Sequence, residues 1–422
     1  MLLNFIRILM MFRRCRCFQT IDRVFVQQFI CLCVITFCVI LPIICFHLRH
    51  SLYYLLWEKN VTRGRNQMRM ENNKRIEDAT AFLKKVSDAR SQLDGHQNVS
   101  HADIGITIIT VSRNRHRLDN YEPKYLTQVV AKFMKAIEET PDLKHKYQLF
   151  LCDVDPIPDS YSEIKPLAKL LPVFQRFGSD LDNPVVWQTM TISDRLEKEK
   201  RDYVFCGRKT LNANVSSIFL VEDDALPHDD LLPVLDRVIS NVFDKSINNG
   251  GHYKKNVTYI KFYHPERLLG YLSLEPERIP ELLCLSCILS LIMLLCYQRY
   301  RPVTASYTHI IWLCFFIYSC VLFIFIGRQN LLELRRVSSQ LYQVTPAPAC
   351  CTPAILYPRD GMEEVLRYLS SVKCKEKFGK DYALEEFRTT HKKTGLMVQP
   401  NLFTHIGMYS SLRNEVLDPF IV

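Results

Sequence analysis

The sequence predicts an α/β fold in which a mixed or mostly parallel sheet is flanked by helices. A transmembrane helix hairpin is inserted into this fold, and a transmembrane anchor precedes it. Three observations predict this: β-branched runs alternate with helical patterns over residues 104–262, an uncharged run covers residues 29–46, and two apolar runs follow each other within residues 282–327. Alternating strands and helices are typical of layered α/β domains. The 422 residues suffice for such a domain plus membrane segments.

The first apolar run, from Phe29 to Phe46, is close to the ~20 residues that cross a bilayer. Arginines crowd the residues before it, which predicts a cytosolic basic tail over residues 1–28 and an anchor over residues 29–48. No small-residue cleavage site follows, so we do not expect a cleaved signal. The chain has a net charge of +10, and Arg7, Arg13, Arg14, Arg16 and Arg23 crowd this end, but no stripe of basic and aromatic residues continues beyond it. We therefore expect a membrane partner and no nucleic acid.

The second and third runs predict transmembrane helices over residues 281–298 and 303–327, joined by a cytosolic turn over residues 299–302 that contains two arginines. The alternative is a buried helical hairpin of a soluble core, which two successive runs without charge disfavour. With a cytosolic N-terminus, this topology places a stem or helix over residues 49–103 in the lumen. The two parts of the α/β domain, residues 104–280 and 328–422, would lie on the same side.

Glycosylation sequons and cysteines follow the same topology. All four Asn-x-Ser/Thr sequons fall in the predicted lumenal stretch, at Asn60, Asn98, Asn214 and Asn256. Nine of the 16 cysteines lie inside the three spans, where a thiol is a small apolar group. Of the five lumenal cysteines, we expect Cys152 to pair with Cys206, and adjacent Cys350 and Cys351 to be candidates for a vicinal bridge. None of the cysteine spacings resembles a zinc site.

The elements of the α/β domain can be read in order from hydrophobic periodicity. A polar helical pattern precedes them over residues 58–98. The expected strands and helices are Ile104–Val111 (strand), Tyr121–Glu139 (helix), Tyr147–Val154 (strand), residues 185–206 (helix), Ser217–Val221 (strand) and Val257–Phe262 (strand). Neither a glycine-rich dinucleotide turn nor a phosphate-binding Gly-Lys-Ser/Thr loop is present in the sequence.

Three adjacent carboxylates, Glu222, Asp223 and Asp224, follow directly after the strand Ser217–Val221. Their mutual repulsion would raise their pKa values unless a cation lies among them. A hard divalent ion such as Mn²⁺ or Mg²⁺ prefers such oxygen ligands, and open α/β sheets bind ligands at the carboxyl ends of their strands. The alternative is an acidic turn that caps the next helix.

Two motifs give the triplet a wider context. Val221-Glu222-Asp223-Asp224-Ala225-Leu226-Pro227 resembles the acidic metal motif of GT-A glycosyltransferases, and residues 399–412, which contain His405, resemble the C-terminal signature of the branching N-acetylglucosaminyltransferase-IV group. Together with Lys261-Phe262-Tyr263-His264-Pro265-Glu266-Arg267-Leu268 and the inserted hairpin, they make the chain similar to the family of post-GPI-attachment N-acetylgalactosamine transferases, the transmembrane protein 246-like proteins. The resemblance covers nearly all of residues 20–422.

This resemblance implies a GT-A-type fold and a metal site. Asp224 would ligate the metal directly and His405 would be the second protein ligand, although a histidine between a phenylalanine and an isoleucine can equally be a core residue. Glu222 and Asp223 would act on the metal through water or on the ribose. Arg113, Arg115 and His116 would contact the diphosphate or uracil of a UDP-sugar, unless they form a solvated basic turn, and Asp202 would face the nucleotide.

An inverting transferase also needs a carboxylate base for the acceptor hydroxyl. The resemblance nominates Asp381, and the acids of Arg359–Glu364 at another helix start are the alternative. The acceptor pocket would include Tyr263, His264, Glu266 and Arg267, unless these residues only shape the entry to the hairpin.

The resemblance thus implies a multi-pass Golgi enzyme with lumenal catalytic parts. It would transfer N-acetylgalactosamine from UDP-GalNAc to the mannose core of the glycan on GPI-anchored proteins, with Mn²⁺ or Mg²⁺. The alternatives are an N-acetylhexosaminyltransferase for N-glycans or another lipid-linked acceptor, and a three-span Golgi scaffold or cargo-binding protein. Because the hairpin separates His405 from the triplet, we expect the two lumenal segments to reassemble around the site.

Overall fold

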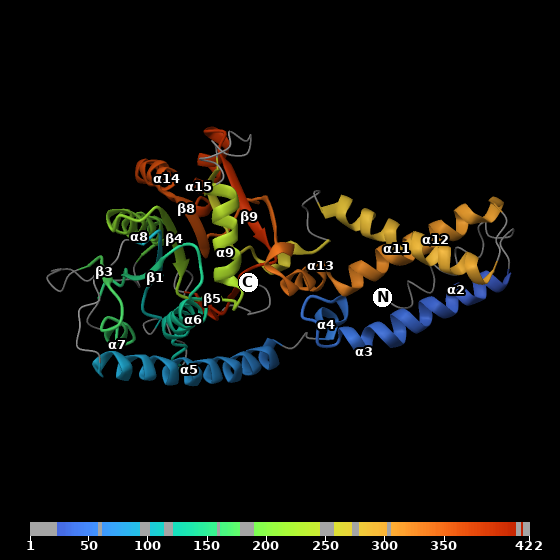
Figure 1. Cartoon of the computed structure of the whole chain (residues 1–422), viewed down its shortest axis with the longest axis horizontal. Helices are drawn as coiled ribbons and strands as arrows, with labels where there is room; N and C mark the ends of the chain where they lie inside the picture. The colour runs from blue at the N-terminus through green and yellow to red at the C-terminus, as the bar shows by residue number, and fades with distance from the viewer. Residues whose placement is uncertain are drawn as a thin grey trace. The chain divides into compact units, whose positions relative to one another are not determined.

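A computed structural model describes residues 23–57, 61–92, 102–113, 121–157, 161–177, 190–244, 257–271, 278–301, 305–410 and 415–416. The chain divides into two compact units (Figure 1). We call residues 1–59 and 267–331 the helical unit, and residues 60–266 and 332–422 the sheet unit. Each unit is therefore built from chain segments that lie far apart in the sequence.

The helical unit contains three helices long and apolar enough to cross a membrane, namely Arg23–Cys45, Arg278–Tyr300 and Tyr307–Ile326. These agree with the three predicted spans. The elements of this region are α2 (Arg23–Ile35), the π-helix η2 (Thr36–Ile40), α3 (Leu41–Cys45), α4 (Leu52–Trp57), η7 (Glu266–Leu269), α11 (Arg278–Tyr300), α12 (Ala305–Ile326) and α13 (Arg328–Leu332).

Aromatic side chains join the first helix to the hairpin. The ring of Phe25 packs edge-on against Tyr297 and Phe315, at centroid distances of 5.4 and 6.0 Å. Further along, the hydroxyls of Thr36 and Tyr318 lie 2.8 Å apart and share a hydrogen bond. Such edge-to-face pairs contribute beyond the area that they bury, so the anchor and the hairpin form one packed bundle.

The sheet unit is built on eight strands in the order β3-β2-β1-β4-β8-β6-β9-β7. The strands are β1 (Ile104–Thr110), β2 (Tyr147–Asp153), β3 (Val173–Gln175), β4 (Ser217–Glu222), β6 (Val257–Lys261), β7 (Gln343–Pro346), β8 (Ala354–Pro358) and β9 (Thr394–Gln399). Strands β3, β2, β1 and β4 are mutually parallel, and β6 is parallel to β9. Strands β8 and β7 run antiparallel to their neighbours. The predicted α/β class and the mostly parallel sheet are confirmed.

Strands from both sides of the hairpin insertion interleave in this sheet. Strand β8 follows the hairpin in the chain, yet it pairs with β4 on one side and β6 on the other, and both of these precede the hairpin. The small sheet of β5 (Ala225–Pro227) and β10 (Phe403–His405) is also made from both segments. The sheet therefore cannot form from either segment alone.

Helices cover both faces of the sheet. They are α5 (Val61–Gln92), α6 (Tyr125–Glu139), α7 (Ile164–Leu167), α8 (Ile192–Asn212), α9 (Leu231–Ile239), η6 (Ser240–Asp244), η8 (Glu333–Val337), η9 (Ser339–Leu341), α14 (Arg359–Ser371) and α15 (Lys380–Thr390). Phe219 of β4 belongs to the core that includes α6 and α9. Neighbouring Leu220 points to the opposite face, toward α8 and α14. This alternation follows from the two-residue period of a strand.

The predicted polar helix before β1 is present as α5, and it packs against the sheet unit (Figure 1). Its Ala79 and Leu83 join the main core. Its Arg75 donates to Gln128 Oε1 of α6 at 2.9 Å. Of the segment expected as a stem or helix, residues 61–92 are thus a helix of the sheet unit.

Several predicted boundaries shift by a few residues. Helix α6 begins at Tyr125, four residues later than expected, after Lys124 in the left-handed region at φ 44°. Helix α8 begins at Ile192, where Thr191 and Asp194 form a capping box that satisfies free backbone N–H groups. Strands β7, β8 and β9 were not predicted from the sequence.

The expected disulfide between Cys152 and Cys206 is confirmed and joins β2 to α8, with the two Cα atoms 5.8 Å apart. Cys350 and Cys351 also pair with each other. The fifth predicted lumenal cysteine, Cys374, is buried and has a free thiol.

Candidate active site

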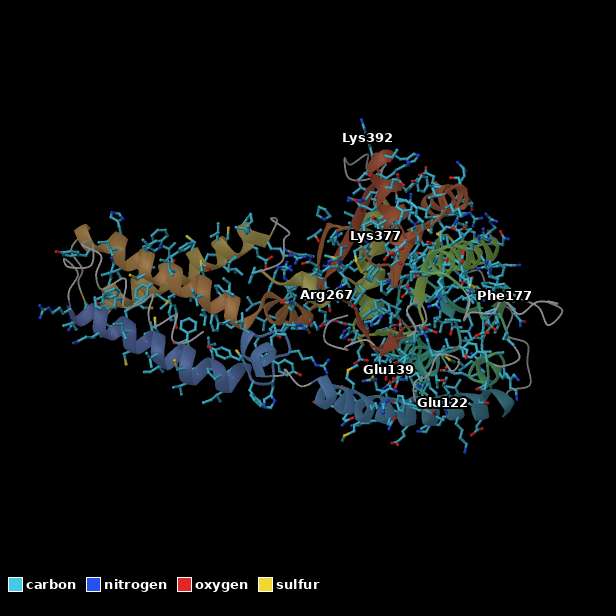
Figure 2. The ribbon with its side chains drawn as sticks, turned by 180° about the vertical axis from the view of Figure 1, so that it is seen from behind. Glu122, Glu139, Phe177, Arg267, Lys377 and Lys392 are labelled. Atoms are coloured by element: carbon cyan, nitrogen blue, oxygen red, sulfur yellow. A yellow bond between two sulfur atoms is a disulfide. The ribbon has the colours of Figure 1, made fainter. Side chains whose placement is uncertain are left out.

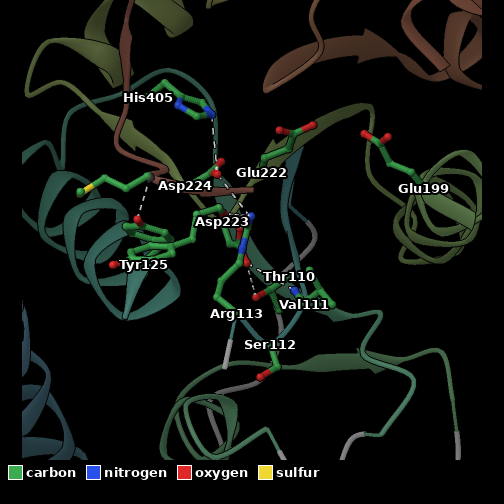
Figure 3. Close-up of polar contacts among 12 residues, drawn as sticks. Thr110, Val111, Ser112, Arg113, Tyr125, Glu199, Glu222, Asp223, Asp224 and His405 are labelled. Carbon is green, nitrogen blue, oxygen red and sulfur yellow. Dashed lines mark hydrogen bonds and ion pairs between the residues drawn. The ribbon is translucent and has the colours of Figure 1, made fainter. Parts of the chain in front are cut away.

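The acidic triplet lies at the carboxyl end of β4, where the chain turns into β5 (Figure 3). Asp223 and Asp224 are buried, with 2% and 5% of their surface exposed. They line a cavity of about 240 Å³. Residues of β1, β4, α8, the start of α15 and the segment after β10 form its walls. The triplet therefore faces a pocket and is not merely a surface turn.

The pairing of β5 with β10 carries His405 to this pocket. His405 is the partner of Ala225 in the antiparallel register, and the backbone N–H of Ile406 donates to the Asp224 carbonyl at 2.9 Å. As a result, His405 Nε2 lies 3.6 Å from Asp224 Oδ2. This is too long for a hydrogen bond. The proximity predicted between the triplet and His405 is present in the structure.

The groups around Asp224 fit a divalent cation. Asp224 Oδ1 is buried, and among the described residues no group hydrogen-bonds to it. A buried carboxylate oxygen without a partner is costly unless a ligand satisfies it. Gly407 lies two residues after His405. A Cβ atom at this position would lie only 2.2 Å from Asp224 Oδ2. Oxygen and imidazole nitrogen ligands, with space kept open by a glycine, suit Mn²⁺ or Mg²⁺.

Asp223 is satisfied within the protein. It accepts hydrogen bonds from the Thr110 hydroxyl at 2.8 Å and from the guanidinium of Arg113. The same Arg113 nitrogen lies 3.2 Å from Asp224 Oδ2, and another donates to the Tyr409 carbonyl at 3.0 Å. Burial acts to raise the pKa of Asp224, but His405 and Arg113 together hold it below its usual value. Asp224 therefore stays ionised and able to bind a cation.

Glu222 points away from this pair, toward Glu199 of α8 (Figure 3). The ammonium group of Lys380, at the start of α15, lies 2.8 Å from Glu222 Oε1 and 2.6 Å from Glu199 Oε1. The three acids of the triplet thus have different neighbours. Glu222 faces Lys380, Asp223 faces Arg113, and Asp224 lies near both Arg113 and His405.

Asp381, the expected base, is held beside the same end of β4. Its carboxylate accepts from the Thr352 hydroxyl at 2.7 Å and from the Cys351 N–H at 3.1 Å. The carbonyl of Pro353, which follows Thr352, accepts from the N–H of Glu222 at 2.8 Å. This connection places Asp381 near the triplet.

The alternative base stretch, Arg359–Glu364, begins at the other end of β4. Pro358 pairs with Ser217 at the start of that strand, and Arg359 N–H donates to the Ser216 carbonyl at 3.1 Å. Since Glu222 is at the opposite end of β4, this geometry favours Asp381 over the acids of α14.

Residues 104–404 match the family described as GPI-N-acetylgalactosamine transferase PGAP4. The matched region is well over half of the 422 residues, and it runs from β1 through the hairpin to β10. The chain belongs to this family. It is therefore a glycosyltransferase of the GPI-N-acetylgalactosamine transferase family, and the cavity at the triplet is its candidate active site.

The resemblance also predicted that Arg113, Arg115, His116 and Asp202 bind the nucleotide. Asp202 lines the cavity and forms ion pairs with Lys198, at 2.5 Å, and with Arg176. Arg113 contacts the acidic triplet itself. Arg115 and His116 lie outside the described residues. Contacts of these side chains with a nucleotide remain a prediction.

The expected acceptor residues have distinct surroundings. Tyr263 is buried, and its ring centroid lies 6.1 Å from that of His405. His264 is fully buried. Its backbone N–H and carbonyl are both bound by the side chain of Asn401, at 3.0 and 2.7 Å. Glu266 belongs to the sheet unit, whereas Arg267, labelled in Figure 2, is exposed and belongs to the helical unit. An acceptor role for the four remains a prediction.

Of the four sequons, Asn214 is exposed in the turn after α8, while Asn60, Asn98 and Asn256 lie outside the described residues.

The sequence did not point to Glu199, Lys380, Thr110 or Gly407, which lie around the triplet. Lys380 and Gly407 each lie within two residues of a predicted site residue, Asp381 or His405, and that spacing was the signal available. The sequence around Glu199 gives no such signal, because this residue reaches the cavity only through the packing of α8.

Proposed function

We propose that this glycosyltransferase moves N-acetylgalactosamine from UDP-GalNAc to the mannose core of GPI-anchor glycans, with inversion at the sugar carbon and with a divalent metal. One observation carries the proposal. Asp224 and His405, which are 181 positions apart in the chain and lie on either side of the membrane hairpin, meet in one buried pocket. The family to which the chain belongs supplies the sugar and the acceptor class.

Asp224 and His405 would hold the metal, and its identity as Mn²⁺ or Mg²⁺ is part of the proposal. When bound, the cation supplies positive charge that stabilises the diphosphate as it leaves. Arg113 keeps Asp223 in place beside the cation ligands, through its ion pairs with both aspartates. Asp223, which Thr110 and Arg113 hold in the wall of the cavity, would lie beside the ribose.

Asp381 would act as the general base. The acceptor hydroxyl oxygen attacks the anomeric carbon while the bond from that carbon to the β-phosphate oxygen breaks, and the hydroxyl proton passes to the Asp381 carboxylate. UDP leaves with the electron pair of the broken bond. The hydrogen bonds from Thr352 and Cys351 orient the carboxylate for this transfer.

We further infer a Golgi membrane location with a lumenal sheet unit. The three apolar helices support membrane association, and the arginine-rich residues before the first helix favour a cytosolic N-terminus. Asn214 tests the orientation, because it lies exposed in the sheet unit. We expect Asn214→Gln to remove one glycan from the cellular protein, and an Asn214 that is never glycosylated would argue against a lumenal sheet unit.

The activity is tested by glycan analysis in cells that lack the gene and are complemented with variants. Wild-type protein should restore one N-acetylhexosamine on the GPI glycan, identified as galactosamine after acid hydrolysis. Asp224→Asn should not restore it, because the isosteric amide removes the charge that holds the cation. The matched control is Asp229→Asn, an exposed acid paired with Lys132 outside the cavity.

Two results would contradict the proposal. Full restoration by Asp224→Asn would show that this carboxylate is not needed. A change confined to N-glycans or to another lipid-linked glycan would show that the acceptor is wrong, while leaving the glycosyltransferase assignment in place.

A further inference from the structure

Three charged side chains form a row along one wall of the active-site cavity. Glu199 comes from α8, Lys380 from the start of α15, and Glu222 from the end of β4. The Lys380 ammonium group lies between the two carboxylates, 2.6 Å from Glu199 and 2.8 Å from Glu222. Its side chain is only 8% exposed, whereas those of Glu199 and Glu222 are 35% and 29% exposed.

We propose that Glu199, Lys380 and Glu222 form the subsite that binds the hydroxyl and acetamido groups of the transferred sugar ring. This inference rests on the proposed function, and it extends that function by assigning the donor-sugar contacts to particular residues.

The position of the row follows from the chemistry of an in-line displacement. The sugar carbon must lie between the leaving diphosphate and the attacking hydroxyl. The diphosphate belongs with the cation ligands, and Glu222 is two residues from Asp224. The hydroxyl belongs with the base, and Lys380 is adjacent to Asp381. The contact between Lys380 and Glu222 therefore joins the strand end that carries the cation ligand Asp224 to the helix start that carries the proposed base.

The charge of the row suits a sugar ring better than a phosphate. Two carboxylates and one ammonium group carry a net negative charge, which repels phosphate oxygens. The Lys380 ammonium group lies between the two carboxylates, and these contacts favour its charged form.

A protonated lysine has three N–H donors. Two of them are directed at Glu199 and Glu222, which leaves one for a sugar oxygen. Each glutamate uses Oε1 for Lys380, so Oε2 can accept from a hydroxyl. The row thus offers an acceptor, a donor and an acceptor in sequence, which matches neighbouring groups on a hexosamine ring.

The ring of Tyr203 lines the same cavity and lies beside Lys380. The Lys380 ammonium group is 5.4 Å from the ring centroid. The Tyr203 hydroxyl shares a 2.8 Å hydrogen bond with that of Tyr357. Both tyrosines are buried. Lys380 is therefore fixed by the two glutamates and the neighbouring ring, while Glu199 and Glu222 keep exposed surface in the cavity.

The test compares binding of UDP and UDP-GalNAc to the full-length chain in detergent, with Mn²⁺ present, by isothermal titration. Glu199→Ala removes one acceptor and leaves Lys380 and Glu222 as a balanced ion pair, so this variant should fold. We expect its Kd for UDP-GalNAc to rise about tenfold or more, as for a lost hydrogen bond to a charged group. Its Kd for UDP should change by less than about twofold, since UDP lacks the N-acetylgalactosamine ring that would lose the contact.

Lys380→Met is the second variant, and it should weaken UDP-GalNAc selectively in the same way. The matched control is Glu197→Ala on the same helix. Glu197 pairs with Lys200 and Arg201, at 3.0 and 2.8 Å, and does not line the cavity. It should leave both affinities unchanged.

Equal weakening of UDP and UDP-GalNAc in Glu199→Ala would overturn the inference, because the row would then support the nucleotide or the fold. Unchanged binding of both ligands would overturn it as well. If the wild-type chain bound neither ligand with Mn²⁺ or Mg²⁺, the proposed function itself would fail, and the subsite with it. A failure of the subsite alone leaves wild-type binding intact, so the two failures are distinguishable.

Discussion

Gly407 gives the sharpest test of the pocket around Asp224. A Cβ atom at this position would lie 2.2 Å from Asp224 Oδ2 and 2.9 Å from His405 Cε1. The first distance is about 1.3 Å shorter than a favourable contact of ~3.5 Å. The backbone of Gly407 lies outside the left-handed region, so alanine can adopt it and the effect of Gly407→Ala is steric.

The Asp224 carboxylate or the segment that carries His405 must move by about 1 Å to relieve this overlap, judged against the same contact distance. Metal sites tolerate displacements of only about 0.2 Å. Disturbing the groups that orient metal ligands lowers affinity about 10–100-fold. We therefore expect the Kd for Mn²⁺ to rise by that factor, and overpacking to cost about 1–3 kcal/mol of unfolding free energy.

The assay is a Mn²⁺ titration followed by the EPR signal of the free ion, with thermal unfolding measured in parallel. Gly270→Ala is the control, because its Cβ would meet Gln329 at an ordinary 3.4 Å. A Gly407→Ala protein that binds Mn²⁺ with wild-type affinity would refute the assignment of the cation to Asp224 and His405.

Three further predictions follow from contacts around the site. Asn401→Ala leaves the buried N–H and carbonyl of His264 without their partner, so the free energy of unfolding should fall by about 2–4 kcal/mol in a thermal or denaturant titration. Thr352→Val removes the hydroxyl that holds Asp381, so kcat should fall about tenfold or more while KM for UDP-GalNAc stays unchanged. Burial lowers the pKa of Lys261 from 10.5 to about 8, so the unfolded chain holds the proton longer and the unfolding free energy should rise with pH across that window. Lys261→Met should abolish this rise.

For each of these three predictions, one measured result would contradict it. Asn73→Ala, on an exposed asparagine, serves as the control for Asn401→Ala, and equal stability of the two variants would deny the role of the Asn401 contact. The control for Thr352→Val is Thr389→Val, on the exposed side of α15. If both variants had the same kcat, Thr352 would not position the base. If the unfolding free energy of Lys261→Met still rose between pH 8 and 10.5, the rise would have to come from another titratable group.

Strands β1, β2, β4 and β6, which precede the hairpin, were predictable because each is a largely buried apolar run. Residues Ile104–Thr110 and Ser217–Glu222 are almost wholly buried, which produces the β-branched pattern of a central parallel strand. Strand β8 was not predicted. It has five residues, Pro353 precedes it, and Pro358 ends it. Its place between β4 and β6 is decided by tertiary pairing with strands that lie before the hairpin.

The candidate site was predictable only in part, for a similar reason. The triplet stands out in the sequence because three acids follow an apolar strand. His405 could be connected to it only through resemblance, since the pairing of two three-residue strands, β5 and β10, leaves no periodic signal. Lys380 and Glu199 are joined to Glu222 solely by the packing of α15 and α8 against the end of β4. Their charges otherwise look like those of ordinary helix surfaces.

The proposed mechanism requires that Asp224 and His405, which lie on either side of the hairpin insertion in the chain, share one divalent cation. Pulsed EPR of the Mn²⁺-loaded full-length protein measures this, because a histidine ligand gives a nitrogen hyperfine coupling to the bound ion. We predict such a coupling in the wild-type protein, its loss in His405→Ala, and the loss of bound Mn²⁺ in Asp224→Asn. A bound ion without nitrogen coupling in the wild type, or a coupling that persists in His405→Ala, would contradict the account.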